Sequence, residues 1–413
     1  MVNTSPVDSE HRFAKYIKEQ QAQGDNRELH VMNFGPTHPS THGVFQNILL
    51  MNGEIILDAD TTIGYIHRAF EKIAEHRTFY QITTLTDRLN YCSAPINNMA
   101  WWMTVEKALN VEVPKRAQYM RVIVMELARI ADHIICCGIM GVDLGAYSPF
   151  LYVMKFRELV YEVFEEICGA RLTTNMGRIG GFERDFSQAA WDKINQFMEG
   201  FPKAWDELQL AFLRNRIFMD RLINVGVIDA EKAVNYGFTG PNLRATGVDY
   251  DVRKMNPYSS YEDFDFSIPV GRAGDTYDRF CVRVEEVKES LKIIRQALDN
   301  LPEGNFHADV PEYYLPPKEA VYTEMESLIN HFKIVMGEYP VPTREVYHSV
   351  EGGNGELGMY LITDGSRAPY RLHFRRPCFV FYQAYPEMIK GMTISDAVAT
   401  LSSLNVIAGE LDA

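Results

Sequence analysis

A long helical segment in the middle of the chain is the feature that most constrains the fold. Its helical pattern runs over residues 115–138. Its apolar residues recur on a face typical of a buried helix, and they are Val122, Val124, Met125, Leu127, Ala128 and Ile130. A buried helix needs other elements around it, and residues 66–222 have helical character throughout. We therefore expect a bundle of long helices in the middle of the molecule.

The regions before the bundle favour a short arm and an antiparallel sheet. Residues 1–27 are polar and suit a short surface helix or a loose arm. In residues 28–65, Asn52 and Gly53 separate two β-prone runs, which is a strong hairpin signal because both turn positions need positive φ. The sequence therefore predicts an N-terminal antiparallel β-sheet.

After residue 236 the sequence predicts an irregular segment, one more long helix of the bundle, and then a region with both helix and strands. Residues 237–274 are rich in proline, glycine and aromatic side chains, and a long helix expected over 275–299 completes a bundle that spans residues 66–300. In residues 301–413, a proline-rich link precedes one more helix, and strand-like text follows over 345–381. We expect an α+β, predominantly helical fold with a mixed C-terminal region.

Composition limits the classes of function. The chain has 413 residues, 46% of them hydrophobic, so it can bury a sizeable core in two or three compact regions. Its net charge of −14 would repel phosphate groups, and nucleic acid is a poor candidate partner. The longest weakly polar stretch, 134–142, is much shorter than the roughly 20 apolar residues of a spanning helix. Since no secretory signal is evident either, we expect a cytoplasmic protein that reaches a membrane through other proteins.

The cysteines do not form a metal-binding pattern. The six cysteines include no CxxC pair, so we expect buried or inert thiols. They are Cys92, Cys136, Cys137, Cys168, Cys281 and Cys378. A cluster or zinc site made by this chain alone would need ligands at closer, repeated spacing. We therefore predict that the chain binds no metal by itself.

The stretch from Gly353 to Gly358 matches the pattern GxGxxG of dinucleotide-binding loops. The residues after it, MYLIT, have the character of a strand, whereas a dinucleotide loop must open a helix. We interpret the motif as a hairpin turn.

Residues 35–43 have the most unusual local sequence in the chain. They place His38 and His42 among prolines and glycines, which prevent a helix, so we expect a loop. As a metal site it is weak, since no third ligand is nearby and the rings do not share a helix face. Imidazole exchanges protons near pH 7, so a proton-handling loop is the better functional hypothesis. Histidines that only cap strands are an equally weighted alternative.

Seven motifs in sequence order add a resemblance. They are GPTHPSTHGV, IGYIHRAFEKIAEHRTF, DRLNY, GRIGGFERD, LRATGVDYDVRK, DTYDRF and GELGMYLITDGSRAPYRLHFRRP. Together they closely resemble the D subunit (49-kDa subunit) family of respiratory complex I, the proton-pumping NADH:quinone oxidoreductase. The resemblance covers the chain from about residue 31 onward and implies a fold like the large subunit of nickel-iron hydrogenases.

The hydrogenase cysteine pairs are missing from this sequence. The segment Asp87 to Cys92 resembles the site of the first pair, and residues 404–407 (LNVI) stand where the second pair would begin. Without those thiolates the chain cannot hold nickel. The resemblance implies that the old metal cavity now receives a quinone.

The resemblance also implies roles for particular residues. Tyr91 and His42 are expected to hydrogen-bond the two carbonyl groups of a quinone, where donors stabilise developing negative charge and supply protons. Asp143 is expected to pair with His42 and favour its imidazolium form, and it is also a candidate cap for the following helix. His38 is expected to take part in the same quinone-binding loop. From the residues alone, core packing is the usual role of a lone tyrosine such as Tyr91 in a helical segment.

Two further positions concern a neighbouring subunit. Arg68 matches a family arginine that faces the terminal iron-sulfur cluster, and an ordinary surface ion pair is its alternative. Thr173 stands where many relatives have a histidine near that cluster, and Ala413 stands where most relatives end in arginine. Both departures remove positive charge, which favours a lower-potential acceptor such as menaquinone.

The function implied by the resemblance belongs to a complex. The chain is expected to form the quinone-reducing site with an iron-sulfur subunit that holds a four-iron four-sulfur cluster, and to bind no cofactor alone. The implied partners are that subunit, the C subunit, the ferredoxin-like I subunit and the membrane H subunit, at the cytoplasmic face of the plasma membrane. Two alternatives stay open: an equivalent complex fed by ferredoxin or another donor, and a non-catalytic scaffold subunit.

Overall fold

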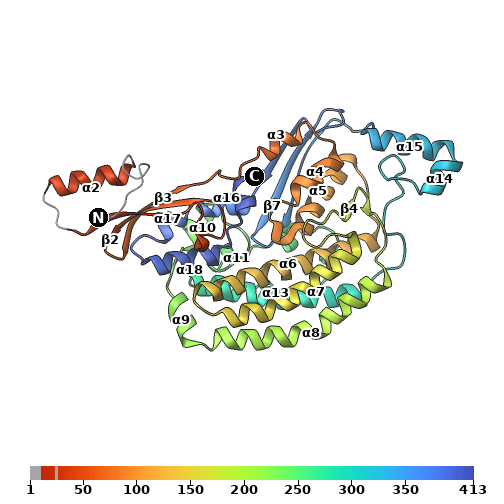
Figure 1. Ribbon diagram of the computed structural model, residues 1–413. Helices are drawn as coiled ribbons and strands as arrows, with labels where there is room; N and C mark the ends of the chain where they lie inside the picture. The colour runs from red at the N-terminus through yellow and green to blue at the C-terminus, as the bar shows by residue number, and fades with distance from the viewer. Residues whose placement is uncertain (1–10, 24–26) are drawn as a thin grey trace.

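The computed structural model describes residues 11–23 and 27–413 and shows an α+β molecule in which helices predominate (Figure 1). The predictions for residues 1–10 and 24–26 of the arm lie outside the described residues. The rest of the arm contains α2 (Arg12–Ala22), a surface helix that packs through Phe13 against Ile48 and Leu50 of the N-terminal sheet. Ile17 packs against the same cluster, and His11 and Arg12 reach Asp60 at 3.0 Å and 3.2 Å, so apolar and polar contacts together attach the arm to the sheet.

The N-terminal sheet is antiparallel, as predicted. It contains β1 (Leu29–Phe34), β2 (Gln46–Asn52) and β3 (Ile55–Thr62), in that order. The hairpin exists, but the expectation that both Asn52 and Gly53 take positive φ is wrong. Asn52 still pairs with Ile55, so the turn consists of Gly53 and Glu54, and of the residues 52–54 only Gly53 has a positive φ, +58°. The strand runs one residue further because Asn52 keeps its backbone pairing.

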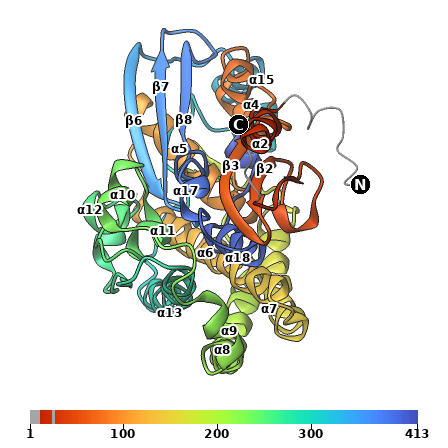
Figure 2. The same ribbon diagram turned by 90° about the vertical axis from the view of Figure 1, so that its left-hand side faces the viewer.

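The predicted bundle of long helices forms the centre of the molecule (Figures 1 and 2). Its long members are α5 (Ala94–Leu109), α6 (Lys115–Asp143), α7 (Tyr147–Cys168), α8 (Gln188–Leu213) and α13 (Thr276–Asp299). Helix α6 contacts α5, α7 and α13, and every residue from 119 to 134 is buried. The buried helix expected from the sequence is thus the axis of the bundle.

Shorter elements complete the bundle region. They are α3 (Phe70–Ala74), α4 (Phe79–Thr86), α9 (Arg216–Leu222), α10 (Ala230–Asn235), α11 (Gly240–Arg244) and α12 (Val252–Met255). The segment 66–222, which was expected to be helical throughout, also contains a small hairpin of β4 (Gly177–Arg178) and β5 (Gly181–Phe182). Gly180 and Gly181 both have positive φ there, so two adjacent glycines allow a turn inside otherwise helical sequence.

The C-terminal region is mixed, as predicted. Helices α14 (Lys318–Thr323) and α15 (Met325–Met336) precede the antiparallel strands β6 (Arg344–Glu351), β7 (Glu356–Thr363) and β8 (Arg371–Arg375). This sheet lies against α5 (Figure 2). The GxGxxG motif forms the turn between β6 and β7, where the amide of Gly352 donates to the carbonyl of Gly355 at 2.7 Å, so its interpretation as a hairpin turn is confirmed.

The strands predicted over residues 345–381 do not extend to residue 381. The last strand ends at Arg375, because Pro377 begins a helix, a position that proline favours. The helices after the sheet are α16 (Pro377–Tyr382), α17 (Tyr385–Met388), α18 (Ile394–Leu404) and α19 (Ala408–Asp412). In residues 11–23 and 27–413, no helix is long and apolar enough to cross a membrane.

A buried network of arginines and carboxylates joins α6 to its neighbours. Its members are Glu126, Arg129, Arg244, Asp251, Arg253, Glu286 and Glu351, and each of them is at most 1% exposed. Arg253 bridges Asp251 at 2.7 Å and Glu126 at 3.2 Å, while Arg244 reaches Glu351 at 2.9 Å. Although burial opposes ionisation of Glu126, its arginine neighbours hold the pKa of this carboxyl below its ordinary value. Burial and the neighbouring Asp251 instead raise the pKa of Glu351. The network connects residues 237–274, α13 and β6 to the central helix.

Replacing Arg253 by methionine should lower the free energy of unfolding by about 3–5 kcal/mol, because Asp251 and Glu126 would be left buried with a cation removed. Denaturant unfolding of the purified chain measures the change. Arg216→Met is the matched control, since that side chain is 92% exposed, and it should change stability by less than about 0.5 kcal/mol. Equal stability of the two variants would contradict a stabilising role for the network.

Candidate functional site

A cavity of about 360 Å³ lies where six segments meet: the loop 35–43, η2 (Tyr91–Ser93), α6, α7, the loop after α7 that carries Leu172, and the C-terminal segment that includes α18. Its lining residues are His42, Tyr91, Cys92, Ile135, Cys136, Ile139, Arg157, Tyr161, Leu172, Ser402, Asn405, Val406 and Ile407. Apolar side chains make up most of this wall, and a few polar groups interrupt it. Such a mixture is typical of sites that bind a flat organic molecule and fix its orientation.

His42 enters the cavity from the loop between β1 and β2. It follows the short helix η1 (Pro39–Thr41) and takes a left-handed conformation with φ +56°, which ends that helix and turns the chain toward β2. Its ring atom Nε2 lies 3.0 Å from Oδ2 and 3.3 Å from Oδ1 of Asp143. Since Nε2 faces a carboxylate, Nδ1 is the ring nitrogen left for a ligand.

Asp143 is held in place to receive this bond. It is the last residue of α6, its side chain is 11% exposed, and the hydroxyl of Ser402 donates to its Oδ2. The alternative role as a helix cap is not observed, because α7 begins after Ala146 and has no side-chain cap. The carboxylate therefore serves the histidine and not the next helix.

Tyr91 offers a free hydroxyl to the same cavity. Among the described residues its hydroxyl has no hydrogen-bond partner. Burial raises the pKa of Tyr91 to about 12, and the neighbouring Cys92, Cys378 and Asp132 act in the same direction. The phenol is therefore protonated at neutral pH and available as a donor.

A buried carboxylate behind Tyr91 positions it. Asp132 of α6 accepts hydrogen bonds from Asn90 at 2.7 Å and from Ser93 at 3.1 Å, on either side of Tyr91 in sequence. Its other oxygen accepts from Asn405 at 3.1 Å. One side chain thus fixes η2 to the C-terminal segment that forms the opposite part of the lining.

The other predicted residues lie outside the cavity. His38 is exposed, its Nδ1 accepts from the amide of Ser40 at 3.2 Å, and its ring packs on Phe34. Arg68 and Thr173 are exposed as well and do not contribute to the lining, although Leu172 does. The structure brings together His42, Tyr91 and Asp143, and it separates the remaining three from them.

Arg157 is a cavity residue that the sequence reasoning missed. Only 9% of it is exposed, and its guanidinium makes no hydrogen bond or ion pair with any described residue. It stacks over the ring of Tyr161 at 4.4 Å. Helical spacing offered a signal, since Arg157 shares the buried face of α7 with Val153 and Val160. A buried cation without a counter-charge among the described residues is costly, so a ligand that brings negative charge into the cavity would stabilise it.

The thiols behave as the sequence suggested. All six are free, and Cys92, Cys136, Cys137 and Cys378 are buried. Burial raises the pKa of Cys136, which lines the cavity, to about 11, so it is a neutral apolar wall group at pH 7. In residues 11–23 and 27–413, no group of three or more His, Cys, Asp or Glu side chains is arranged to hold a metal ion.

The end of the chain is tied to the segment that precedes Arg68. The carboxylate of Asp412 accepts from the amides of Gly64 at 2.8 Å and Ile66 at 3.0 Å, and its carbonyl faces Nδ1 of His67 at 2.6 Å. Arg376 donates a hydrogen bond to the main-chain oxygen of Ala413, the residue after Asp412. A positive charge is therefore present beside Ala413.

Asp412→Ala should release this segment. We expect the amides of Gly64 and Ile66 to exchange their hydrogens roughly 10- to 100-fold faster, because each loses its acceptor, while α6 keeps its protection. Hydrogen exchange followed by mass spectrometry measures both regions. Asp220→Ala, on the exposed face of α9, is the control and should change neither. Unchanged exchange at Gly64 and Ile66 would show that other contacts hold the segment.

Comparison with known proteins identifies the family of the chain. A family model described as respiratory-chain NADH dehydrogenase, 49 Kd subunit, matches residues 143–413. The NADH-quinone oxidoreductase D subunit of Flavobacterium psychrophilum is 74% identical over 405 residues, which are 98% of each chain. The D 2 subunit of the Cytophaga hutchinsonii enzyme is 69% identical over 94% of this chain and 100% of its own length. The D subunit of the Leptospira biflexa enzyme is 51% identical over 92% of this chain and 94% of its own. The chain therefore belongs to the 49 kDa subunit family of the respiratory-chain NADH dehydrogenases.

Proposed function

We propose that this chain, together with an iron-sulfur partner subunit, forms the site where a proton-pumping NADH:quinone oxidoreductase reduces quinone to quinol. Family membership makes the chain a subunit of an oxidoreductase complex, and the catalytic site is the proposal. The observation that carries it is one cavity lined both by His42, which is paired with Asp143, and by Tyr91, whose hydroxyl has no partner among the described residues.

The lining suits a quinone head group. Ile135, Ile139, Val406 and Ile407 offer apolar surface to a flat ring, while Tyr91 and His42 offer polar atoms for its oxygens. A quinone is apolar over its ring and accepts hydrogen bonds only at its two carbonyls. The cavity has the same division, so its lining matches the polarity of a quinone head group.

The proton chemistry follows from which atoms are free. Reduction of a quinone adds two electrons and two protons, and negative charge grows on its oxygens. Because Nε2 of His42 is directed at Asp143, Nδ1 is the ring atom that can hydrogen-bond a quinone oxygen, and it delivers a proton when the ring carries one there. Tyr91 donates its phenolic proton to the other oxygen. Donors placed before the charge develops lower the barrier and deliver the protons.

Arg157 supports the same proposal. Its charge is nearly buried and has no carboxylate partner in the described chain, so the cavity has a positive potential at that side. A quinone whose oxygens gain electron density would compensate this cation. A buried cation is unfavourable without negative charge nearby. When the substrate gains negative charge on reduction, it stabilises Arg157, and the cavity therefore favours the reduced form.

Electrons come from outside this chain. In the proposal they arrive from a four-iron four-sulfur cluster of the partner subunit, which the exposed Arg68 and the segment of Thr173 face. His38 shapes the loop that carries His42. The C subunit, the ferredoxin-like I subunit and the membrane H subunit complete the surroundings at the cytoplasmic face of the plasma membrane. Threonine at position 173 favours menaquinone as the acceptor.

Tyr91→Phe tests the proposal in the intact complex. We expect NADH-driven quinone reduction to fall about 10²-fold, because one proton donor is lost, while NADH still reduces the iron-sulfur clusters. Tyr360→Phe is the control, since that hydroxyl bonds Glu345 on the exposed side of β7. Normal quinone turnover by Tyr91→Phe would return this residue to a packing role and leave a scaffold function standing.

Arg157→Met separates charge from packing. We expect quinone turnover to fall at least about tenfold while the melting temperature of the complex stays equal or rises, because an uncompensated buried cation has been removed. Arg157→Lys should recover part of the turnover, since it restores the charge. Steady-state kinetics and thermal unfolding provide the two measurements. A lower melting temperature with normal turnover would assign Arg157 to packing alone.

A further inference from the structure

One end of the molecule exposes an apolar helix face. Helix α15 carries large apolar side chains at helical spacing, and between 45% and 77% of each is exposed. We call this face the α15 stripe, and it consists of Met325, Leu328, Ile329, Phe332, Val335 and Met336. The buried residue of α15 is Ile334 instead. With α14, the helix projects from the body at the end opposite α2 (Figure 1). An amphipathic helix that turns its apolar face outward indicates an interaction surface.

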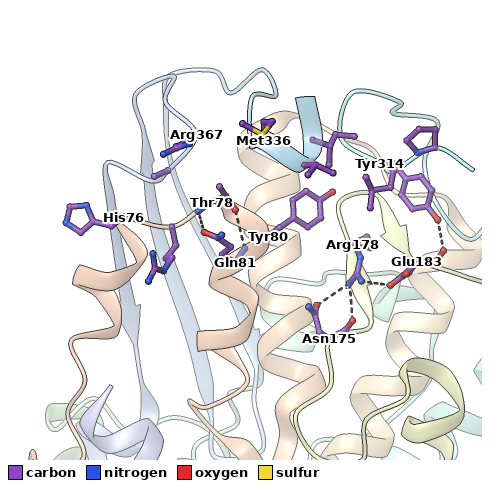
Figure 3. A pocket seen from close by; sticks show the side chains of 16 residues that line it. His76, Thr78, Tyr80, Gln81, Asn175, Arg178, Glu183, Tyr314, Met336 and Arg367 are labelled. Atoms are coloured by element: carbon purple, nitrogen blue, oxygen red, sulfur yellow. Dashed lines mark hydrogen bonds and ion pairs between the residues drawn. The ribbon is translucent and has the colours of Figure 1, made fainter. Parts of the chain in front are cut away.

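A hollow of about 860 Å³ adjoins the C-terminal end of this stripe, where Val335 and Met336 belong to its lining. Figure 3 shows Tyr80 and Tyr314 on one side of the hollow and His76 and Arg367 on the other, below the end of α15. The surface thus has an apolar part and a basic part next to each other.

The basic part is not neutralised by the chain itself. His76, Arg77 and Arg367 are exposed, and their side chains make no hydrogen bond or ion pair with any described residue. Arg178 is the one lining arginine with a carboxylate partner, Glu183. Since the whole chain has a net charge of −14, unpaired cations gathered in one hollow do not reflect its general composition. They indicate an occupant that carries carboxylates.

The wall of the hollow is already in place. Tyr314 donates to the carbonyl of Glu183 at 2.5 Å, Tyr80 donates to the carbonyl of Tyr313, and Arg178 donates to the carbonyl of Asn175 at 3.0 Å. These bonds join three segments that are distant in sequence. An occupant therefore does not have to order the wall, which removes one cost of binding.

We propose that the α15 stripe and the adjoining hollow are the docking surface for an acidic and apolar segment of another subunit of the same complex. Its carboxylates pair with Arg77 and Arg367, and its apolar side chains cover the stripe. Residues 325–336 span roughly 17 Å of helix, at 1.5 Å per residue, so the occupant is a polypeptide segment and not a small molecule. The proposal uses only membership in a multisubunit family and is independent of the quinone chemistry.

Site-specific photo-crosslinking in the intact complex tests it. Benzoylphenylalanine replaces Phe332 in one variant and Met336 in another, and Ile217, which is 75% exposed on α9, in a control. Both test positions should crosslink to the same peptide of another subunit, a peptide that contains Asp or Glu, and the control should not reach that peptide. No adduct with another subunit, an adduct without carboxylates, or an adduct between two copies of this chain would overturn the proposal.

Charge reversal tests the basic part separately. With benzoylphenylalanine at position 336, the double change Arg77→Glu and Arg367→Glu should lower the crosslink yield about tenfold, equivalent to about 1.4 kcal/mol. Arg216→Glu, at a side chain that is 92% exposed, should leave the yield unchanged. Equal yields in both would overturn the carboxylate pairing. If the double variant does not assemble, Arg77→Gln with Arg367→Gln is measured by the same criterion. Quinone turnover does not enter either readout, so the result is separate from that of Tyr91→Phe.

Discussion

The structure depends on the ionic contacts that α6 makes in the interior. Arg129 donates to the carbonyls of Glu351 and Gly352 at 2.7 Å and 2.8 Å, which fixes the turn between β6 and β7 to the central helix. His133, one helical turn further, is hydrogen-bonded to Glu286 of α13 at 2.7 Å, and burial lowers the pKa of this histidine. Buried polar and charged groups are costly when one partner is missing but orient their elements strictly when all are present. The helix can therefore serve as a fixed reference for everything packed around it.

The same helix builds the candidate site. Its residue Asp132 holds the two walls that contain Tyr91 and Asn405, and its last residue, Asp143, receives His42 from a loop far away in the sequence. Between these carboxylates the helix presents the apolar side chain of Ile139 to the cavity. One rigid element thus supplies the two anchoring carboxylates and part of the apolar wall, which is how side chains from distant segments keep a common geometry.

Much of the fold could be predicted, and the limits have physical causes. Helical periodicity identified the bundle, and Asn52-Gly53 identified a hairpin, but the exact turn was missed because strand pairing extended through Asn52. The predicted strand region extended too far beyond residue 375, since apolar residues such as Phe381 suit a buried helix as well as a strand. Of the site, the resemblance supplied His42, Tyr91 and Asp143. Arg157 was missed because helical spacing can indicate that a residue is buried but not which cavity its side chain lines.

The sequence by itself determined the class of fold, the family and the types of chemistry available, because periodicity, turn residues and long motifs are local properties. Only the tertiary structure decided which of these residues meet. It joined Asp143 to His42 across the loop and the bundle, left His38 outside the cavity, and placed Arg157 inside it without a counter-charge. It also turned the apolar face of α15 outward. These are relations between distant segments. They arise when those segments pack around α6, and no local sequence pattern encodes such packing.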